Sequence, residues 1–451
     1  MSVNSGPPKS ATNFALALLA MCVGMALAYE VGRGQTFGLG GVVGYLPLIP
    51  CLGIVIVIGV GEWLWPNLRT PSDGGLSRKT LRALSLPRAC TRMLGVAATF
   101  ALLALVYWLL PEYSGDFYGP YWNFLRTLAP LAALIPFYLL WADRRIAEPH
   151  DEYHAFGALV SGAWRTTDWT LIRRHLLGWT VKGFFLPLMT VYLLGEVKSL
   201  TEAIGNWNGG HELMPAYQVF YHVSYTLDLL FCVVGYSAAI RLFDSHIRSV
   251  EPTVAGWLVA LMCYQPFYSV IGQYYLQYDD ATFWDNWLQA WPTLRVVWAV
   301  LVIALTLTYS LCTVSFGLRF SNLTHRGIIT SGPYRFTKHP AYLSKNLSWW
   351  LISVPFVSEL GWSAALRNCL LLALLNTVYY ARARTEERHL SADPTYVAYA
   401  LWINEHGLLK RLGQILPFAR YRAPTAGVPT DAAPANKAQP RRRGPKQQAN
   451  V

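Results

Sequence analysis

The chain contains few charged residues for its length. Of its 451 residues, 14% are charged, whereas 53% are hydrophobic and 14% are aromatic. A soluble domain carries about 25% charged residues, so this deficit indicates that lipid surrounds most of the folded chain. The apolar runs also lack the strict alternation that a β-barrel requires. The sequence therefore predicts an all-α, polytopic integral membrane protein.

Cysteine motifs and metal-ligand motifs are also missing. The seven cysteines are scattered along the chain, and none of them forms a CxxC or Cys/His spacing. Because such spacings are the usual signature of metal sites and disulfide frameworks, the sequence predicts neither a bound metal nor a disulfide framework.

Long apolar runs are abundant instead. About ten segments approach the roughly 20 residues that a membrane-spanning helix needs. They lie near residues 13–29, 41–65, 93–110, 125–142, 176–195, 216–240, 254–271, 293–316, 341–357 and 362–380. Basic residues gather in the loops after the even-numbered segments, and the intervening loops are acidic or nearly uncharged. By the positive-inside rule, we expect both termini in the cytoplasm.

The chain divides into three parts by composition. Residues 1–290 form an N-terminal transmembrane region of about seven helices, residues 291–422 form a C-terminal membrane module, and residues 423–451 form a basic tail. The tail is rich in Pro, Ala and Gln and cannot bury a core, so we expect disorder there. Its Arg441-Arg442-Arg443 run favours anionic lipid headgroups. We expect no nucleic acid, because nothing aromatic or folded accompanies the run.

A polar, basic turn at residues 332–342 leads directly into an apolar helix. Pro340 suits the first helical position, after which the helix begins. The unsatisfied amide groups at such a helix start attract a carboxylate or phosphate, particularly beside Arg335 and His339. The turn is therefore a candidate ligand site at the cytoplasmic face.

A second polar cluster, residues 382–389, contains the carboxylates Glu386 and Glu387. Two apolar runs separate this cluster from the turn and predict a helical hairpin, which brings both clusters to the same membrane face. The glutamates either pair with neighbouring arginines or face the basic turn. In the second arrangement, the two clusters form a receptor for a zwitterion such as an amino-acid headgroup.

Polar side chains inside the predicted hairpin are candidates for binding a substrate. Asn346 shares a helical face with Tyr342, and Asn376 and Tyr380 lie along one broad face of the partner helix. An amide about one turn inside the membrane is unfavourable unless it is hydrogen-bonded.

The N-terminal region adds two further candidates, His222 and Asp228, within one predicted span. Exposing an aspartate to lipid at mid-bilayer costs about 2.5–3.5 kcal/mol. Asp228 therefore either lines an acceptor cavity or makes a buried structural hydrogen bond.

The turn and the glutamate pair together resemble a known family. The turn reads Gly-Pro-Tyr-Arg-Phe-Thr-Lys-His-Pro-Ala-Tyr over residues 332–342, and Glu386-Glu387 follow after the hairpin, with Leu390, Tyr396 and Tyr399 further on. This pattern is similar to that of the isoprenylcysteine carboxyl methyltransferase and phospholipid methyltransferase superfamily, whose hallmark is Arg-His-Pro-x-Tyr-x-Gly followed by Glu-Glu. Lys338 stands where the family usually has Arg, and Ser344 where it usually has Gly.

The resemblance implies an S-adenosylmethionine-dependent methyltransferase acting on a lipophilic acceptor held in the membrane. It implies that His339 and Tyr342 contact the cofactor, that Pro340 shapes the turn, and that Glu386 and Glu387 hold the methionyl or ribose end. A carboxylate acceptor is favoured over an amine, which must first lose a proton.

Two other functions stay open at this point. One is an NADPH-dependent membrane reductase of the sterol-reductase type, whose C-terminal module is similar. The Glu-Glu pair and the lack of a clear Lys-Tyr-Gly-x-x-Trp tail weigh against it. The other is a non-enzymatic transporter or lipid-binding membrane protein that retains the hairpin.

Overall fold

The computed structural model describes residues 6–32, 48–68, 75–77, 81–207, 209–280, 282–416, 418 and 420–424. The basic tail predicted over 423–451 lies outside these residues from position 425 onward. Its expected contacts with anionic lipids stay a prediction.

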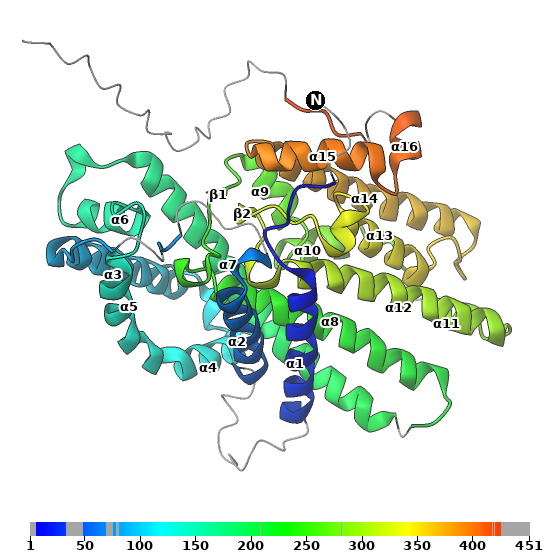
Figure 1. Cartoon of the computed structure of the whole chain (residues 1–451). Helices are drawn as coiled ribbons and strands as arrows, with labels where there is room; N and C mark the ends of the chain where they lie inside the picture. Colours follow the sequence, from blue (N-terminus) through cyan, green and yellow to red (C-terminus); the bar gives the residue numbers. More distant parts are fainter. Residues whose placement is uncertain are drawn as a thin grey trace, which may run out of the picture.

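Helices make up nearly all of the regular structure (Figure 1). The α-helices of the N-terminal region are α1 (Phe14–Gly32), α2 (Leu48–Leu64), α3 (Leu86–Leu109), α4 (Gly119–Leu128), α5 (Ile135–Asp143), α6 (Glu152–Val160), α7 (Trp169–Asn206), α8 (Leu213–Ser237), α9 (Val254–Leu261), α10 (Phe267–Val270) and α11 (Trp284–Trp287). Those of the C-terminal part are α12 (Pro292–Ser315), α13 (Pro340–Ser353), α14 (Trp362–Leu390), α15 (Pro394–His406) and α16 (Lys410–Ile415). The two short strands are β1 (Ser249–Val250) and β2 (Thr324–His325).

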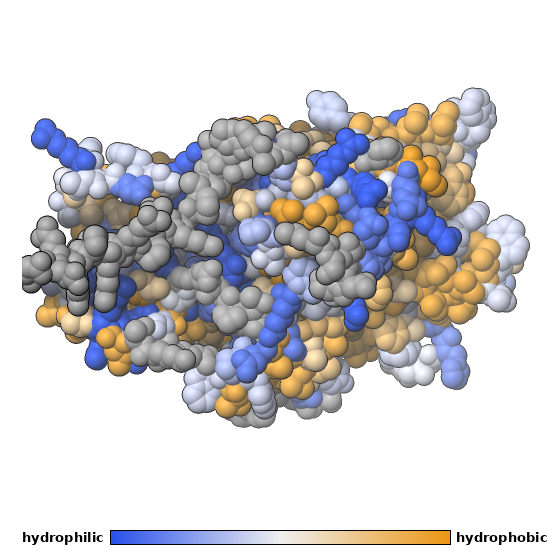
Figure 2. Space-filling view, turned by 45° about the horizontal axis from the view of Figure 1, so that its top comes forward, coloured by the Kyte–Doolittle hydropathy of each residue, from blue (hydrophilic) through white to orange (hydrophobic). Residues whose placement is uncertain are grey.

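Seven helical stretches in the described residues are long and apolar enough to cross a membrane. They are Phe14–Val31, Leu86–Leu109, Asp116–Asp143, Trp169–Asn206, Leu213–Ser237, Pro292–Ser315 and Trp362–Leu390. Large apolar side chains such as Trp108, Phe137 and Leu370 are exposed, and hydrophobic residues cover broad areas of the face in Figure 2. Lipid is the solvent that suits such a surface. The predicted all-α, multi-pass membrane fold is thus confirmed.

Three of the ten predicted spans correspond to shorter helices, so the count of ten stays a prediction. Helix α2 has 17 residues and α13 has 14. At 1.5 Å per residue, α13 is about 21 Å long, which is less than the roughly 30 Å hydrocarbon core. The segment 254–271 is broken after α9, and the four-residue helix α10 and a π-helical turn follow. The break contains Pro266, which has no backbone N–H to continue a helix.

The main core lies where α7 and α8 pack against the first two helices and α12. It includes the buried side chains of Ala17, Ile54, Phe185, Leu230 and Val314, one from each of these five helices. Figure 1 shows α1 and α2 side by side, with α8 passing behind them toward α12. The C-terminal helices are therefore built onto the N-terminal region.

A buried ionic cluster joins α3 to the segment after α5. The Arg92 guanidinium donates to Asp143 Oδ1 at 2.9 Å, to Asp151 Oδ1 at 3.2 Å and to the Pro149 carbonyl oxygen at 2.6 Å. Arg88 donates a second pair of hydrogen bonds to Asp143. The side chains of Arg92, Asp143 and Asp151 are at most 2% exposed. All three charges are compensated locally, as buried charges require.

The strands β1 and β2 form an antiparallel ladder that links the end of the N-terminal region to the loop before the turn. Ser249 pairs with His325, and Val250 pairs with Thr324. Beside the ladder, the buried Arg326 guanidinium donates to the carbonyl oxygens of Ser245, Gly235, Phe320 and Leu318 at 2.6–2.9 Å. These contacts fix the loop after α12, which forms one wall of the candidate site.

Candidate active site

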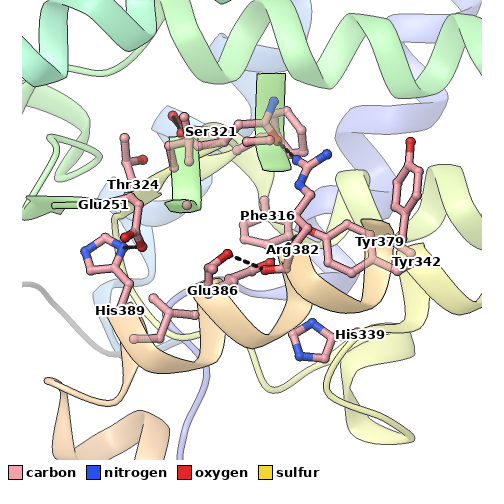
Figure 3. Close-up of a pocket in the computed structure, with 18 of the residues that line it drawn as sticks. Glu251, Phe316, Ser321, Thr324, His339, Tyr342, Tyr379, Arg382, Glu386 and His389 are labelled. Carbon is pink, nitrogen blue, oxygen red and sulfur yellow. Dashed lines mark hydrogen bonds and ion pairs between the residues drawn. The ribbon is translucent and has the colours of Figure 1, made fainter. Parts of the chain in front are cut away.

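One cavity of about 950 Å³, a volume that includes the part open to solvent, lies between α9, α12, α13, α14 and the loop after α12. Figure 3 shows Glu251 and His389 on one side of it, Tyr342, Tyr379 and Arg382 on the other, and Glu386 between them. Its lining residues are Glu251, Gly256, Ala260, Tyr264, Tyr309, Thr313, Phe316, Phe320, Ser321, Asn322, Leu323, Thr324, Tyr334, His339, Ala341, Tyr342, Lys345, Tyr379, Arg382, Thr385, Glu386, His389 and Leu390.

The predicted turn forms the floor beside α13. Helix α13 begins at Pro340, with His339 in the N-cap position. Proline is favoured at the first helical position because its missing N–H is not needed there. Helix α15 holds the turn from outside, since the Tyr399 hydroxyl donates to the Tyr334 carbonyl oxygen at 2.6 Å. This places His339 and Tyr334 at the cavity.

Glu387 lies against the basic turn and does not line the cavity. Its carboxylate contacts Lys338 Nζ at 2.6 Å, His339 Nε2 at 3.2 Å and an Arg384 guanidinium nitrogen at 2.5 Å. Burial lowers the pKa of Lys338 below its usual value, and the Glu387 carboxylate opposes this shift. The contacts join the start of α13 to the end of α14. Glu387 therefore closes the hairpin, and its charge is compensated by the turn itself.

Glu386, one residue earlier, faces the cavity. The Tyr342 hydroxyl donates to its Oε2 at 2.7 Å, and both residues are lining residues. The Tyr342 ring stacks on the His339 ring, with centroids 5.6 Å apart. The two halves of the sequence motif thus meet at the cavity through His339, Tyr342 and Glu386.

Two cationic side chains also line the cavity. Arg382 is buried, donates to Asn322 Oδ1 at 2.6 Å, and lies over the rings of Tyr264 and Tyr342. Lys345, one turn further into α13, has its ammonium within 5.0–5.9 Å of three aromatic ring centroids. These rings belong to Tyr309, Trp349 and Tyr379. The aromatic faces stabilise each cation without neutralising its charge.

Asp228 lies behind Lys345 and does not line the cavity. It is buried on α8, where it accepts hydrogen bonds from the hydroxyls of Thr313 and, at 3.0 Å, Tyr309. It also interacts electrostatically with the Lys345 ammonium. Asp228 therefore links α8 to α12 and faces Lys345 from the side away from the cavity.

Glu251 and His389 form a wall that the sequence did not point to. Glu251 follows β1 and is 2% exposed, and its Oε2 lies 3.9 Å from His389 Nδ1. His389 Nε2 is hydrogen-bonded to Ser249 Oγ at 2.8 Å. Glu251 stands in a short polar stretch between apolar segments. Only the two-residue ladder brings it to the site, and no periodic signal in the sequence predicts such a ladder.

Asn346 and Asn376 lie outside the cavity lining and fasten the hairpin. Asn376 donates to Asn346 Oδ1 at 3.0 Å and accepts from Trp350 Nε1 at 2.8 Å. Each amide thereby gains the partner that a membrane interior demands. Their geometry fits a structural role in joining α13 to α14.

The remaining predicted residues also lie away from the cavity lining. Tyr380 is exposed and donates to the Phe418 carbonyl oxygen at 3.1 Å. His222 is hydrogen-bonded to Glu196 of α7 at 2.6 Å. Arg335 is exposed at the turn. No group of three or more His, Cys, Asp or Glu side chains that could hold a metal ion occurs in the described part of the chain.

The two departures from the family pattern have local explanations. Ser344 is 4% exposed, is not a lining residue, and donates to the Pro340 carbonyl oxygen of its own helix at 2.8 Å. Its side chain therefore does not intrude on the cavity. Lys338 contacts one carboxylate oxygen of Glu387. This contact needs only one charged donor, so a lysine ammonium can replace the two-pronged arginine guanidinium here.

Residues 295–392 match the model of the isoprenylcysteine carboxyl methyltransferase (ICMT) family. This part of the C-terminal module is therefore similar to the ICMT family. No curated protein and no solved structure matches the chain. The match confirms the resemblance carried by the turn and the glutamate pair, and it supports a membrane methyltransferase. It includes α13 with its turn, all of α14 and nearly all of α12, whereas Glu251 and Tyr264 of the cavity wall lie outside it.

Proposed function

We propose that the protein is an S-adenosylmethionine-dependent methyltransferase whose acceptor is a lipophilic carboxylic acid held in the membrane. The observation that carries this proposal is the meeting of His339, Tyr342 and Glu386, all within the part similar to the ICMT family, at one cavity. Bound S-adenosylmethionine supplies an electrophilic methyl group on a positively charged sulfur.

The cavity has features that suit this cofactor. Its lining combines aromatic rings with a few charged groups, as small-molecule sites commonly do. A sulfonium is attracted both to carboxylates and to aromatic faces. Glu386 supplies the carboxylate, and Phe316, Tyr334 and Tyr342 supply aromatic rings. These four residues are the ones we expect to hold the cofactor.

Arg382 and Lys345 favour a carboxylate acceptor. Both are cations on one part of the cavity wall, so a carboxylate placed beside them is attracted and an ammonium placed there is repelled. In a water-poor site, this charge preference is stronger than it would be in bulk solvent. A carboxylate is already nucleophilic, so no side chain has to remove a proton from it. The chain's own contribution is then alignment of the two reactants, which is worth about 7–11 kcal/mol.

The basic loops support a site that opens to the cytoplasm, where the methyl donor is present. The lining residues His339, Glu386 and His389 lie at the basic ends of α13 and α14. With the positive-inside rule, this end of the hairpin is cytoplasmic. The acceptor's apolar part then extends into the bilayer beside α12 and α13.

Binding measurements on the protein in lipid nanodiscs test the proposal. Wild type is expected to bind S-adenosylmethionine and not NADPH. Glu386→Gln is expected to weaken S-adenosylmethionine binding about tenfold, or about 1.4 kcal/mol. It should weaken S-adenosylhomocysteine binding less, because that ligand has a neutral sulfur. The control is Thr377→Ala on the exposed face of the same helix. Saturable NADPH binding without S-adenosylmethionine binding would overturn the proposal in favour of a reductase.

A further inference from the structure

The cavity has a second carboxylate that comes from outside the ICMT-family match. Of the two motif glutamates, Glu387 already forms ion pairs with Lys338, His339 and Arg384. Glu386 alone is therefore directed into the cavity from that pair. Glu251 also lines the cavity, and Figure 3 shows it on the side away from Tyr342 and Tyr379. The site thus has two cavity carboxylates, one from the module and one from the N-terminal region.

Glu251 is held in one orientation by its neighbours. Its Oε1 accepts hydrogen bonds from the Thr253 backbone N–H at 3.0 Å and from the Thr253 hydroxyl. Gly256 makes room for it, since a Cβ at that position would lie 2.4 Å from Glu251 Cγ. The backbone is fixed as well, because the Glu251 N–H donates to the Leu323 carbonyl oxygen at 2.7 Å.

The other oxygen, Oε2, keeps its hydrogen-bonding capacity. Its nearest charged neighbour is His389 Nδ1 at 3.9 Å, beyond hydrogen-bond distance. Arg388 approaches Oε1 at 3.8 Å, but its side chain is 58% exposed and donates to Thr253 Oγ1. A carboxylate that is 2% exposed needs closer compensation than this.

Thr324 supplies a second unused acceptor on the same wall. It belongs to β2, which pairs with the strand that ends just before Glu251. Its Oγ1 is buried and has no hydrogen-bond partner among the described residues. Figure 3 shows Thr324 next to Glu251 at the cavity. A buried polar atom without a partner is unfavourable, so both residues favour a ligand with several donors.

We propose that Glu251 and Thr324 bind the ammonium group of the methionyl portion of the cofactor. This rests on the proposed function. An ammonium carries three donors and one positive charge, so it satisfies Glu251 Oε2 and Thr324 Oγ1 and compensates the buried carboxylate. A neutral hydroxyl, such as a ribose hydroxyl, donates only one hydrogen bond and leaves the charge of Glu251 uncompensated.

Two ligands that differ in the amino-acid portion distinguish binding of the ammonium group from binding of the nucleoside. S-Adenosylhomocysteine carries the amino-acid portion, whereas 5′-methylthioadenosine is the same nucleoside thioether without it. Both are measured on the full-length protein in nanodiscs, by displacement of labelled S-adenosylhomocysteine. Glu251→Gln is expected to weaken S-adenosylhomocysteine at least tenfold and 5′-methylthioadenosine less than twofold. Thr324→Val is expected to change the ratio of the two affinities, S-adenosylhomocysteine over 5′-methylthioadenosine, about threefold in the same direction.

The possible outcomes are distinguishable. An equal loss for both ligands places Glu251 on the nucleoside and overturns the proposal, as does an unchanged affinity for S-adenosylhomocysteine. If Glu251→Gln does not fold, Thr324→Val decides, because it removes one hydroxyl and keeps the shape; an unchanged ratio then overturns the proposal. Wild-type protein that binds neither ligand contradicts the proposed function itself.

Discussion

Two ionic clusters in this protein look alike in composition and differ in what they leave unsatisfied. Around Arg92, the three central charges of Arg92, Asp143 and Asp151 are buried and matched, and none of these side chains lines the cavity. Around Glu387, the charges are also matched. Glu386 and Glu251, however, line the cavity, and their carboxylates can still accept further hydrogen bonds. Burial of charge alone therefore does not mark a site. Incomplete coordination beside a cavity does.

The largest effect is expected from Arg92→Met, which leaves Asp143 and Asp151 buried with less compensation. Breaking a buried ion pair from one side costs about 3–5 kcal/mol. The midpoint of thermal unfolding in detergent measures it, with the exposed Arg126→Met as control. If Arg92→Met lowers the unfolding midpoint no more than Arg126→Met does, the cluster has no structural role.

Glu387→Gln tests the other half of the comparison. It removes the charge that faces Lys338, His339 and Arg384, and hydrogen bonds to charged groups contribute about 1.5–3 kcal/mol each. We expect a clear loss of stability from Glu387→Gln. Glu386→Gln should cost less, about 1 kcal/mol, because its single charged hydrogen bond from Tyr342 becomes a neutral one to the amide oxygen. If the two variants are equally unstable, the distinction between a closing and a ligand-facing glutamate is wrong.

Ser344→Gly restores the residue that is usual in the family. Because the Ser344 side chain is buried and bonds within its own helix, the change is expected to cost about 1 kcal/mol of helix stability. Affinity for S-adenosylmethionine should stay within twofold of wild type. A large gain in affinity would mean that the serine side chain obstructs the cofactor.

A loss of stability that depends on pH is expected from Asp393→Asn at the start of α15. Burial raises the pKa of Asp393, but the His325 ring nitrogen 3.2 Å away and the hydrogen bond from the Thr395 backbone N–H outweigh it and hold the pKa at about 2. The charged form thus stabilises the fold above the unfolded pKa of about 3.9, and this contribution disappears as the pH falls toward 2. Asn keeps the cap but loses the charge, and a pKa lowered from about 3.9 to about 2 corresponds to about 2.6 kcal/mol, so we expect a loss of up to about that size at pH 7. The difference in thermal midpoint should vanish near pH 2; a difference that does not depend on pH would contradict the assignment.

Much of the fold follows from the sequence because lipid imposes simple rules. Length and hydropathy predicted the long helices, and the turn at Pro340 correctly marked the start of α13. The break at 254–271 is signalled by Gln265-Pro266 and not by hydropathy, because the apolar composition continues across Pro266. Hydropathy detects which residues prefer lipid and is insensitive to where the backbone stops being helical.

The site was predictable only where its parts lie on one hairpin. Helical spacing brought the turn to Glu386 and Glu387, but it did not distinguish which glutamate faces the cavity. That choice depends on the side-chain contacts of Glu387. Asp228 and Glu251 depend on how the N-terminal helices and β1 meet the module, and such long-range pairings leave no local pattern in a single sequence.

The ladder between β1 and β2 also determines which residues must be transferred for this site to be rebuilt in another protein. A graft of residues 291–422 into another membrane protein would carry the family motif and the hairpin, yet it would leave Glu251 and Tyr264 behind. Its cavity would lack one side. A transfer of the complete site must therefore include the stretch from β1 to Tyr264 together with the module. The smallest transferable unit is thus discontinuous in sequence, and it is larger than the motif by which the site is recognised.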